Sequence, residues 1–355
     1  MLLHVITSLR AGGAERLVAQ MLPRLHRAGI ACELALLDGT RTPFLEEVER
    51  AGITIHSLGI GLKGVYSPRH ILRLRSLMKR ADIVHTHNTP AQVLAALALP
   101  NPRPRMVTTE HNTDNRRRRF PLSRAFDRRL YSRYDAVVCC SEPVRTALRE
   151  HLRSKSIDGR IVSITNGIDL APYFAIAPRD ARGLDNVKVV MVSAFRPQKD
   201  HRTALEAIAR LPERFKLTLA GDGATRHAAE SLAAKLGIQD RVEFTGNLTD
   251  IPALYARSNI AVLSTHYEGL SLTTIEAMAS GVPFIASDVA GVRENICGGA
   301  MLVAENDPAA LADAIKAIAD NPDLAHSLSQ KGRAAAENYN IENTVNEYIT
   351  LYNSI

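Results

Sequence analysis

The sequence contains no tryptophan, and aromatic residues make up only 5% of its 355 positions. It has four cysteines, Cys32, Cys139, Cys140 and Cys297, with no C-x-x-C pair among them. This usage excludes a disulfide-rich secreted domain and argues against a structural zinc site. We therefore expect free thiols in the cytoplasm.

Long apolar runs are also absent. No run approaches the roughly 20 residues that a membrane-spanning helix needs. Residues 1–16 are apolar and then glycine-rich, without a basic start or a small-residue cleavage site, so we interpret them as a first strand and not as a signal peptide.

Positive charge is concentrated in the first half of the chain. The net charge is +7, yet residues 1–170 hold 27 Lys and Arg against 15 Asp and Glu, while the remainder holds 17 against 22. A nucleotide site needs only a few cations, so the basic half predicts a second anionic partner.

Short apolar runs alternate with amphipathic stretches along the whole chain, which predicts α/β domains with parallel sheets. Turn residues and two prolines at 166–178 mark a break. We expect a Rossmann-like domain at 1–167, a second at 168–340 and a terminal helix at 341–355, with ligands beyond the carboxyl ends of the strands. The predicted strands are residues 2–7, 31–37, 54–58, 83–86, 106–109, 136–140, 160–164, 188–192, 216–220, 242–245, 260–263, 284–287 and 300–303.

The segment EGLSLTTIEAMA at 268–279 carries the strongest chemical signal. It follows a predicted strand and opens a helix, whose first free N–H groups suit a phosphate. Gly269 lets a ligand approach the backbone closely. Glu268 is expected in the loop and Glu276 in the helix, so the two acids suit two parts of a ligand. A lone acidic pair in a strand–loop–helix connection would more often be solvated, and the flanking pattern reverses that interpretation.

Seven motifs in order give the chain a family resemblance. It resembles the retaining glycosyltransferases of family 4 (glycosyl transferases group 1), which have the GT-B fold: two Rossmann-like domains facing across a cleft, with a C-terminal helix returning to the N-terminal domain. The motifs are GGAER at 12–16, DIVHTHN at 82–88, TEHN at 109–112, NGID at 166–169, RPQKD at 196–200, AGDG at 220–223 and E-x7-E from 268.

The resemblance implies a hexosyltransferase that needs no cofactor and takes a nucleotide-diphosphate sugar, UDP being the commonest donor of the group. Leaving-group catalysis follows, in which cations stabilise the departing nucleoside diphosphate. The implied catalytic residues are His111, Glu268, Lys199 and Arg196. The implied donor-binding residues are Gly12, Gly13, Asn247, Leu248, Gly269, Leu270, Ser271, Leu272 and Glu276.

One position departs from the family pattern. The arginine that usually precedes the lysine by five residues is replaced by Ala194. If residues 194 and 196 lie in a strand, their side chains point the same way, so Arg196 is expected to take over the role. The alternative is a solvent-facing arginine.

The sequence predicts no metal site. His85 and His87 form an H-x-H pattern and His111 follows, but no thiolate or acidic ligand accompanies them. No D-x-D pattern occurs, and the resemblance links that motif to the metal of the other glycosyltransferase fold. The reaction is thus expected to be metal-independent.

A basic amphipathic helix is predicted after Arg116–Arg119. Leu122, Phe126, Leu130 and Tyr134 recur every four residues and form a predicted core-facing stripe. Solvated arginines are the simple interpretation. The functional one is that cations bind a polyprenyl-diphosphate-linked or other lipid-linked acceptor on the cytoplasmic face of the cell membrane, in polysaccharide synthesis. The arginines expected to do so are Arg116, Arg117, Arg118, Arg119, Arg124 and Arg128.

Other functions stay open at this stage. A small soluble acceptor is the main alternative, and a donor-binding protein without activity is another. A Rossmann-type oxidoreductase is disfavoured because the Gly12–Gly13 pair lacks the G-x-G-x-x-G spacing. Nucleic acid binding is disfavoured because no base-stacking aromatic pattern accompanies the basic residues.

Overall fold

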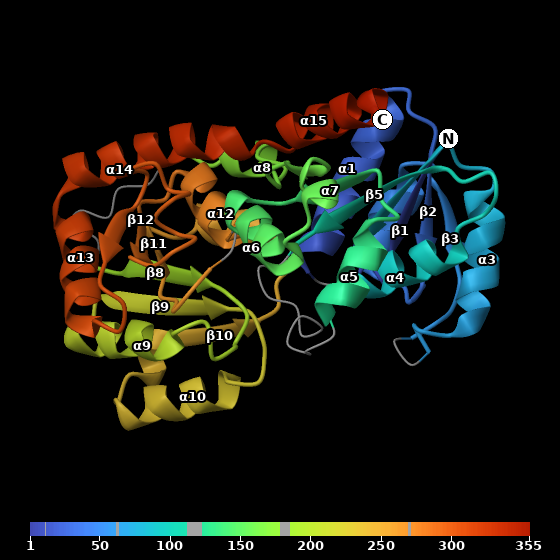
Figure 1. Ribbon diagram of the computed structural model, residues 1–355. Coiled ribbons are helices and arrows are strands. Elements are labelled where there is room, and N and C mark those ends of the chain that lie inside the picture. The colour runs from blue at the N-terminus through green and yellow to red at the C-terminus, as the bar shows by residue number, and fades with distance from the viewer. Residues whose placement is uncertain (11, 62–63, 112–122, 178–184, 269–270) are drawn as a thin grey trace. The chain divides into compact units, whose positions relative to one another are not determined.

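A computed structural model describes residues 1–10, 12–61, 64–111, 123–177, 185–268 and 271–355 (Figure 1). The chain divides into two compact units. Unit 1 combines Met1–Ile168 with Ile341–Ile355, and unit 2 is Asp169–Asn340. Both units are built on parallel sheets, which confirms the predicted α/β class.

Unit 1 contains a seven-stranded parallel sheet in the order β3-β2-β1-β4-β5-β6-β7. Its strands are β1 (Leu2–Ile6), β2 (Cys32–Leu36), β3 (Thr54–Ser57), β4 (Ile83–His87), β5 (Arg105–Glu110), β6 (Ala136–Cys139) and β7 (Ile161–Ser163). Its described helices are α1 (Gly13–Arg27), α2 (Pro43–Arg50), α3 (Pro68–Met78), α4 (Thr89–Ala98), α5 (Ser123–Tyr131), α6 (Glu142–Leu152), α7 (Lys155–Asp158) and α15 (Ile341–Ser354).

Alternating strand residues feed two apolar clusters in unit 1. Side chains such as Leu3 and Val5 of β1 join the cluster formed with α3, α4, α5 and α6. Leu2 and Ile6 join the opposite cluster, which contains residues of α1, α2 and α15. The sheet is therefore buried on both faces, as parallel sheets require.

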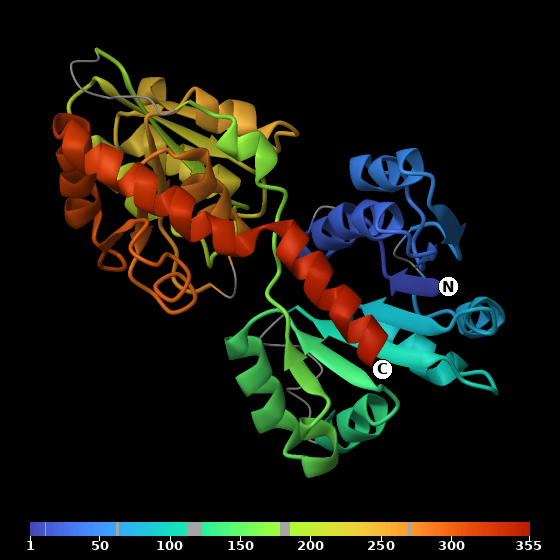
Figure 2. The same ribbon diagram turned by 90° about the horizontal axis from the view of Figure 1, so that it is seen from above.

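Helix α15 completes the core of unit 1 although it comes last in the chain (Figure 2). Ile341, Val345, Tyr348 and Tyr352 are buried in the same cluster as Leu2 and Ile6. Thr344 ties the helix to the end of β7, because its Oγ1 accepts from the Gly167 N–H at 2.8 Å and donates to the Thr165 carbonyl at 2.9 Å.

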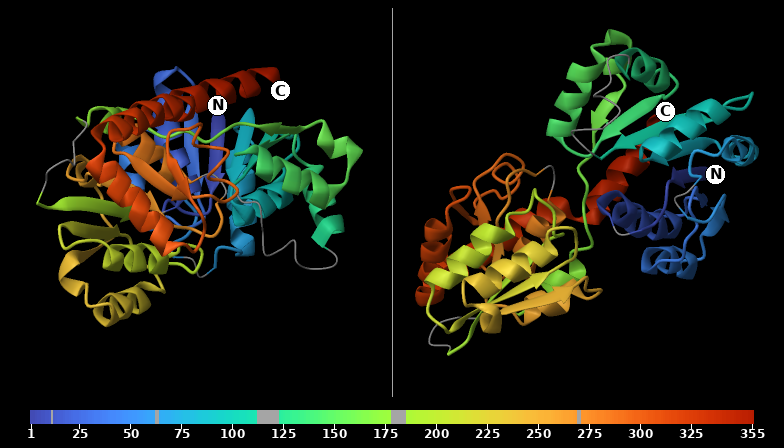
Figure 3. Two further views of the ribbon diagram at one scale, coloured as in Figure 1. Left: turned by 90° about the vertical axis from the view of Figure 1, so that its left-hand side faces the viewer. Right: turned by 90° about the horizontal axis from the view of Figure 1, so that it is seen from below.

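Unit 2 contains a six-stranded parallel sheet in the order β10-β9-β8-β11-β12-β13. Helix α9 packs against α13, and α12 packs against α8 and α14; Figure 3 shows these helices from two further sides. The strands are β8 (Val187–Val192), β9 (Phe215–Ala220), β10 (Val242–Gly246), β11 (Ile260–Leu263), β12 (Phe284–Ser287) and β13 (Met301–Val303). The described helices are α8 (Ala171–Phe174), α9 (His201–Arg210), α10 (Arg226–Lys235), η2 (Gln239–Arg241), α11 (Ile251–Ala256), α12 (Leu272–Ser280), α13 (Pro308–Asp320), α14 (Pro322–Ala336) and η3 (Glu337–Tyr339).

Each sheet reverses its strand order at one place. In unit 1 the reversal lies between β1 and β4, and in unit 2 it lies between β8 and β11. Ligands of doubly wound sheets bind at the carboxyl ends of the strands beside such a reversal. The loops after these four strands are therefore where functional side chains are expected.

The predicted apolar stripe of the basic helix is partly wrong. Leu130 and Tyr134 are buried, but Phe126 is 50% exposed and Asp127 is buried instead. Asp127 is drawn inward because its Oδ2 pairs with His151 Nε2 of α6 at 2.8 Å. Leu122 lies outside the described residues. Within the described chain, none of the helices combines the length and apolarity needed to cross a bilayer.

Candidate functional site

Lys199 and Glu268 form an ion pair at the strand reversal of unit 2. Lys199 follows β8 and Glu268 follows β11, so the pair joins the two loops that the reversal brings together. Lys199 Nζ donates to Glu268 Oε1, and the same oxygen accepts from Thr265 Oγ1 at 2.8 Å. The side chains are only 13% and 7% exposed. The structure thus brings together two of the predicted catalytic residues.

The loop that carries Lys199 is held by its neighbours on α9. Asp200 caps the helix by accepting from the Thr203 N–H at 3.1 Å. His201 Nδ1 donates to the Lys199 carbonyl at 3.0 Å, which leaves Nε2 to accept from Ser193 Oγ at 3.0 Å. Burial lowers the pKa of His201 to about 4, so the ring stays neutral. These contacts fix the backbone from which the Lys199 side chain extends.

Helix α12 begins beside the ion pair with buried hydroxyl groups. Ser271 is its N-cap and Thr274 lies in its first turn; they are 5% and 1% exposed. Among the described residues, neither Ser271 Oγ nor Thr274 Oγ1 has a hydrogen-bond partner. Leu272 is the first helical residue, and Glu276 lies inside the helix and is 3% exposed. A helix N-terminus with unused hydroxyls is suited to an anion.

The expected geometry of Arg196 is wrong. Strand β8 ends at Val192, so residues 194 and 196 lie in a bend and the same-side rule for strands does not apply. Arg196 is exposed. Its N–H donates to the Ala194 carbonyl at 2.9 Å, which tightens the turn that leads to Lys199.

The remaining predicted donor-binding residues of unit 2 are more exposed or lie outside the described residues. Asn247 follows β10 and is exposed, and Leu248 is partly buried. Gly269 and Leu270 lie outside the described residues.

At the strand reversal of unit 1, Gly12 is the N-cap of α1 and Gly13 its first residue. A Cβ added to Gly12 would lie 2.1 Å from Glu15 Oε2, so the glycine makes room for that carboxylate. Glu15 Oε1 accepts from Asn88 Nδ2 at 2.9 Å. Burial raises the pKa of Glu15.

Asn88 and Glu15 are therefore residues that the sequence reasoning missed. Asn88 has a left-handed backbone, with φ +70°, at the turn between β4 and α4. A non-glycine residue in this region of backbone space often marks a functional site. Both residues belong to quoted motifs, GGAER and DIVHTHN, and that was the available signal.

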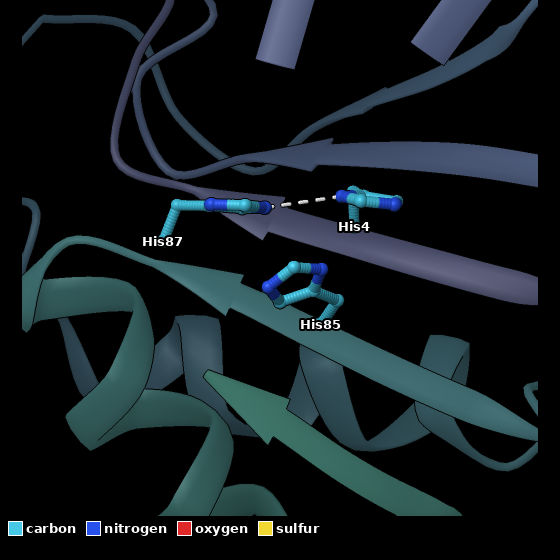
Figure 4. A group of neighbouring side chains, drawn as sticks. All are labelled: His4, His85 and His87. Atoms are coloured by element: carbon cyan, nitrogen blue, oxygen red, sulfur yellow. Dashed lines mark hydrogen bonds between the residues drawn. The ribbon is translucent and has the colours of Figure 1, made fainter. Parts of the chain in front are cut away.

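Histidines line the same edge of unit 1. His4, His85 and His87 are fully buried, and Figure 4 shows them on the neighbouring strands β1 and β4. One nitrogen of each lies within 4.8 Å of the others, a spacing at which a metal ion fits. Both nitrogens of His85 already meet hydroxyls, those of Tyr352 at 2.6 Å and Thr109 at 2.7 Å. These hydrogen bonds explain the position of the His85 ring without a metal ion. That the reaction is independent of metal remains a prediction.

His111, the predicted catalytic histidine, lies just beyond β5 and is partly buried. Its Nε2 lies 3.4 Å from His87 Nδ1. Burial lowers the pKa of His111 to about 4, so its imidazole is neutral near pH 7.

The predicted acceptor-binding arginines fall into two groups. Arg116, Arg117, Arg118 and Arg119 lie outside the described residues. Of the other two, Arg124 is exposed, whereas Arg128 has a structural role. Arg128 Nε donates to the Leu152 carbonyl at 2.6 Å and Nη2 donates to the Arg153 carbonyl at 2.9 Å, so the side chain closes the end of α6.

Comparison with known proteins places this geometry in a family. Residues 177–335 match the family described as glycosyl transferases group 1, and residues 11–172 match glycosyltransferase family 4. The chain is 31% identical to the lipopolysaccharide core biosynthesis mannosyltransferase LpsB of Rhizobium meliloti over 245 residues, covering 64% of this chain and 67% of LpsB. It is 27% identical to the putative glycosyltransferase EpsD of Bacillus subtilis over 344 residues, covering 89% and 87% of the two chains.

Solved structures agree on the fold. Anabaena Alr3699/HepE, whose crystal structure contains UDP and glucose, superposes with a TM-score of 0.83 at 18% identity over 100% of this chain and 99% of that one. This likeness confirms the expected GT-B fold. With two parallel-sheet units, matches to both family regions and the relationship to LpsB, the chain belongs to the group 1 glycosyltransferases and is a sugar-transferring enzyme of the GT-B fold.

Proposed function

We propose that this enzyme transfers a hexose or N-acetylhexosamine from a nucleotide-diphosphate sugar, with UDP as the carrier, and retains the anomeric configuration. The observation that carries the donor assignment is the start of α12, where Ser271 and Thr274 bury hydroxyls without described partners beside the Lys199–Glu268 pair. Buried polar groups are normally hydrogen-bonded, so these hydroxyls suit the oxygens of a diphosphate.

Donor binding changes the partner of Lys199. In this structure the ammonium of Lys199 is paired with Glu268. A diphosphate at the start of α12 attracts Lys199 and frees Glu268 to accept hydrogen bonds from sugar hydroxyls. Lys199 and the helix N-terminus then stabilise the charge that develops on the leaving diphosphate. Glu276 binds the ribose, Arg196 assists at the diphosphate, and His111 contacts the transferred sugar.

The acceptor we propose is a lipid-linked saccharide in cell-surface polysaccharide synthesis. The name of LpsB, a lipopolysaccharide core mannosyltransferase, supports this class of product. Unit 1 supports peripheral binding to a membrane, because Leu72 of α3, Leu97 of α4 and Phe126 of α5 are 72%, 55% and 50% exposed. All three helices cover the same face of the sheet. Arg129 and Arg133 line an apolar pocket together with Leu97 and Phe126.

A panel of UDP- and GDP-sugars tests the donor assignment. We expect one donor to raise Tm and to be hydrolysed slowly without acceptor, and Glu268→Gln to abolish turnover. Transfer to a polyprenyl-diphosphate saccharide supports the acceptor, whereas transfer to small soluble alcohols alone would favour a soluble acceptor. No response to any donor contradicts the proposal.

Binding to anionic vesicles tests membrane association. We expect the protein to sediment with phosphatidylglycerol vesicles at low salt and to dissociate as salt rises. Arg124→Glu in unit 1 should weaken binding about fivefold or more, since a basic residue near the surface contributes about 1 kcal/mol. The matched control is Arg202→Glu, at a 77% exposed side chain of unit 2. Equal loss in both variants, or no binding at low salt, argues against docking through unit 1.

A further inference from the structure

Three histidines of unit 1 form a hydrogen-bonded chain that ends at the proposed sugar contact. His4 Nδ1 lies 3.1 Å from His87 Nε2, and His87 Nδ1 lies 3.4 Å from His111 Nε2. The rings of His4 and His87 are nearly parallel, with an interplanar angle of 10° and centroids 5.4 Å apart (Figure 4). Strand register explains the chain, because His4 pairs with His85 across β1 and β4, and His87 pairs with Thr109 of β5, two residues before His111.

The members of the chain are neutral. Burial lowers the pKa of His4 to about 3 and that of His111 to about 4, and it lowers the pKa of His87 well below the usual value. The groups packed around the chain are His85 of β4, Thr109 of β5, and Tyr348 and Tyr352 of α15. Burial raises the pKa of both tyrosines, so they are neutral as well.

A chain of neutral imidazoles has only two proton arrangements. Each ring carries one N–H and one lone pair, so every nitrogen–nitrogen contact needs one donor and one acceptor. If His4 donates from Nδ1, His87 must donate from Nδ1 and His111 must carry its proton on Nδ1. In the reverse arrangement His111 donates from Nε2, and His4 is left with its proton on Nε2.

The surroundings of the two ends distinguish these arrangements. His4 Nε2 is buried without a described partner, in a residue with no exposed surface. His111 Nδ1 is likewise a buried atom without a described partner, but its residue is partly exposed and lies at the carboxyl edge of the sheet, whereas His4 has no exposed surface. An orphaned buried N–H is especially unfavourable, so the proton belongs at the end that lies at the ligand-binding edge of the sheet.

We propose that His4 and His87 are positioning residues, which hold the proton of His111 on Nδ1 through this hydrogen-bonded chain. His111 then presents an N–H, and not a lone pair, to an acceptor oxygen of the bound donor. The identity of that ligand rests on the proposed function, whereas the proton position does not.

Nitrogen-15 NMR of the imidazole groups in the full-length protein tests the proton position directly. We expect His111, assigned from the signals lost in His111→Gln, to be the Nδ1–H form in the wild type. His4→Phe and His87→Phe should release it into a mixture of both forms. His4→Asn, whose amide N–H replaces the Nδ1 donor, should restore the Nδ1–H form. The matched control is His85→Phe, a buried ring on the same face outside the chain, which should leave His111 unchanged.

Two results overturn the proposal: an Nε2–H form of His111 in the wild type, or an unchanged His111 spectrum in both chain variants. The wild-type spectrum suffices even if a variant fails to fold. In turnover assays we expect His4→Phe to lower kcat/KM about three- to tenfold, the worth of one hydrogen bond, and His4→Asn to restore it. If His111→Ala keeps full activity while the spectra behave as expected, the role of His111 in the proposed function is wrong. The proposed proton position in the histidine chain is then still supported.

Discussion

At the scale of single residues, the hydroxyl of Thr274 offers a test that separates stability from donor binding. Because Thr274 Oγ1 is buried without a described partner, Thr274→Val removes none of the hydrogen bonds among the described residues. We expect an unfolding free energy that is unchanged or raised by up to about 1 kcal/mol. Donor affinity, measured by calorimetry, should fall about three- to tenfold, since a diphosphate contact is removed.

The control for this prediction is Thr344→Val. Thr344 Oγ1 makes two hydrogen bonds, to the Gly167 N–H and the Thr165 carbonyl, in unit 1. Loss of these two hydrogen bonds in Thr344→Val should lower the unfolding free energy by about 1–3 kcal/mol and leave donor affinity unchanged. The same affinity loss in both variants would argue against an anion site at the start of α12.

Buried histidines should make unit 1 sensitive to acid. The folded pKa values of His4 and His111 are lowered to about 3 and about 4, while the unfolded value is near 6.5. Between these values the unfolded chain binds more protons, so stability is full above about pH 6.5 and falls as the pH decreases. Each such histidine contributes a slope of up to about 1.4 kcal/mol per pH unit.

Hydrogen exchange of β4 amides between pH 4 and 7 measures this slope for unit 1. We expect His4→Phe to reduce it, and His26→Gln, at an exposed position of α1, to leave it unchanged. An equal slope in the wild type and His4→Phe would contradict the prediction.

At the scale of elements, Gly221 and Gly223 hold the loop after β9 against the loop after β8. Their φ values are +140° and +154°, and an added Cβ would lie 2.1 Å from the Ser193 carbonyl oxygen or 2.3 Å from that of Phe195. We therefore expect Gly221→Ala to lower Tm strongly and to weaken donor binding, because the displaced loop carries Lys199. Gly237→Ala is the control: φ is +67° but nothing lies within 4 Å of the added Cβ, so only about 1 kcal/mol should be lost. Similar effects of the two changes would contradict this account.

Elements were also what the sequence predicted best. All thirteen strands form within one or two residues of the predicted ranges, because a buried parallel strand is a short apolar run between turn residues. The helix α12 that carries Glu276 was predicted for the same reason, since it follows a clear strand. The Lys199–Glu268 pair needed the structure, because the partners lie 69 residues apart.

Two predictions failed for different reasons. Arg196 was assigned strand geometry, but β8 had already ended at Val192. The four-residue spacing around Phe126 suggested a buried ring, whereas the His151 contact rotates Asp127 inward. The histidine chain escaped prediction because its members belong to β1, β4 and the end of β5, and only strand register brings them together.

At the scale of the whole molecule, the last helix is part of the first unit. Removing residues 341–355 uncovers the apolar surface under Val345, Tyr348 and Tyr352 and leaves His85 without its Tyr352 partner. We expect the truncated chain to lose exchange protection in β1 and β4 while the strands of unit 2 stay protected. Unchanged protection in unit 1 would show that its core is stable without α15.

Because α15 is translated last, it also determines when unit 1 can finish folding during synthesis. Residues Asp169 to Asn340 separate the two parts of unit 1, so 172 residues must be translated before its core is closed. At about 5–20 residues per second, this takes roughly 10 to 35 s. During that interval the part of the unit 1 core that α15 covers is exposed, and unit 2 can already fold. The nascent chain therefore passes through a stage at which a chaperone, or the helix of another copy, competes for the place of α15.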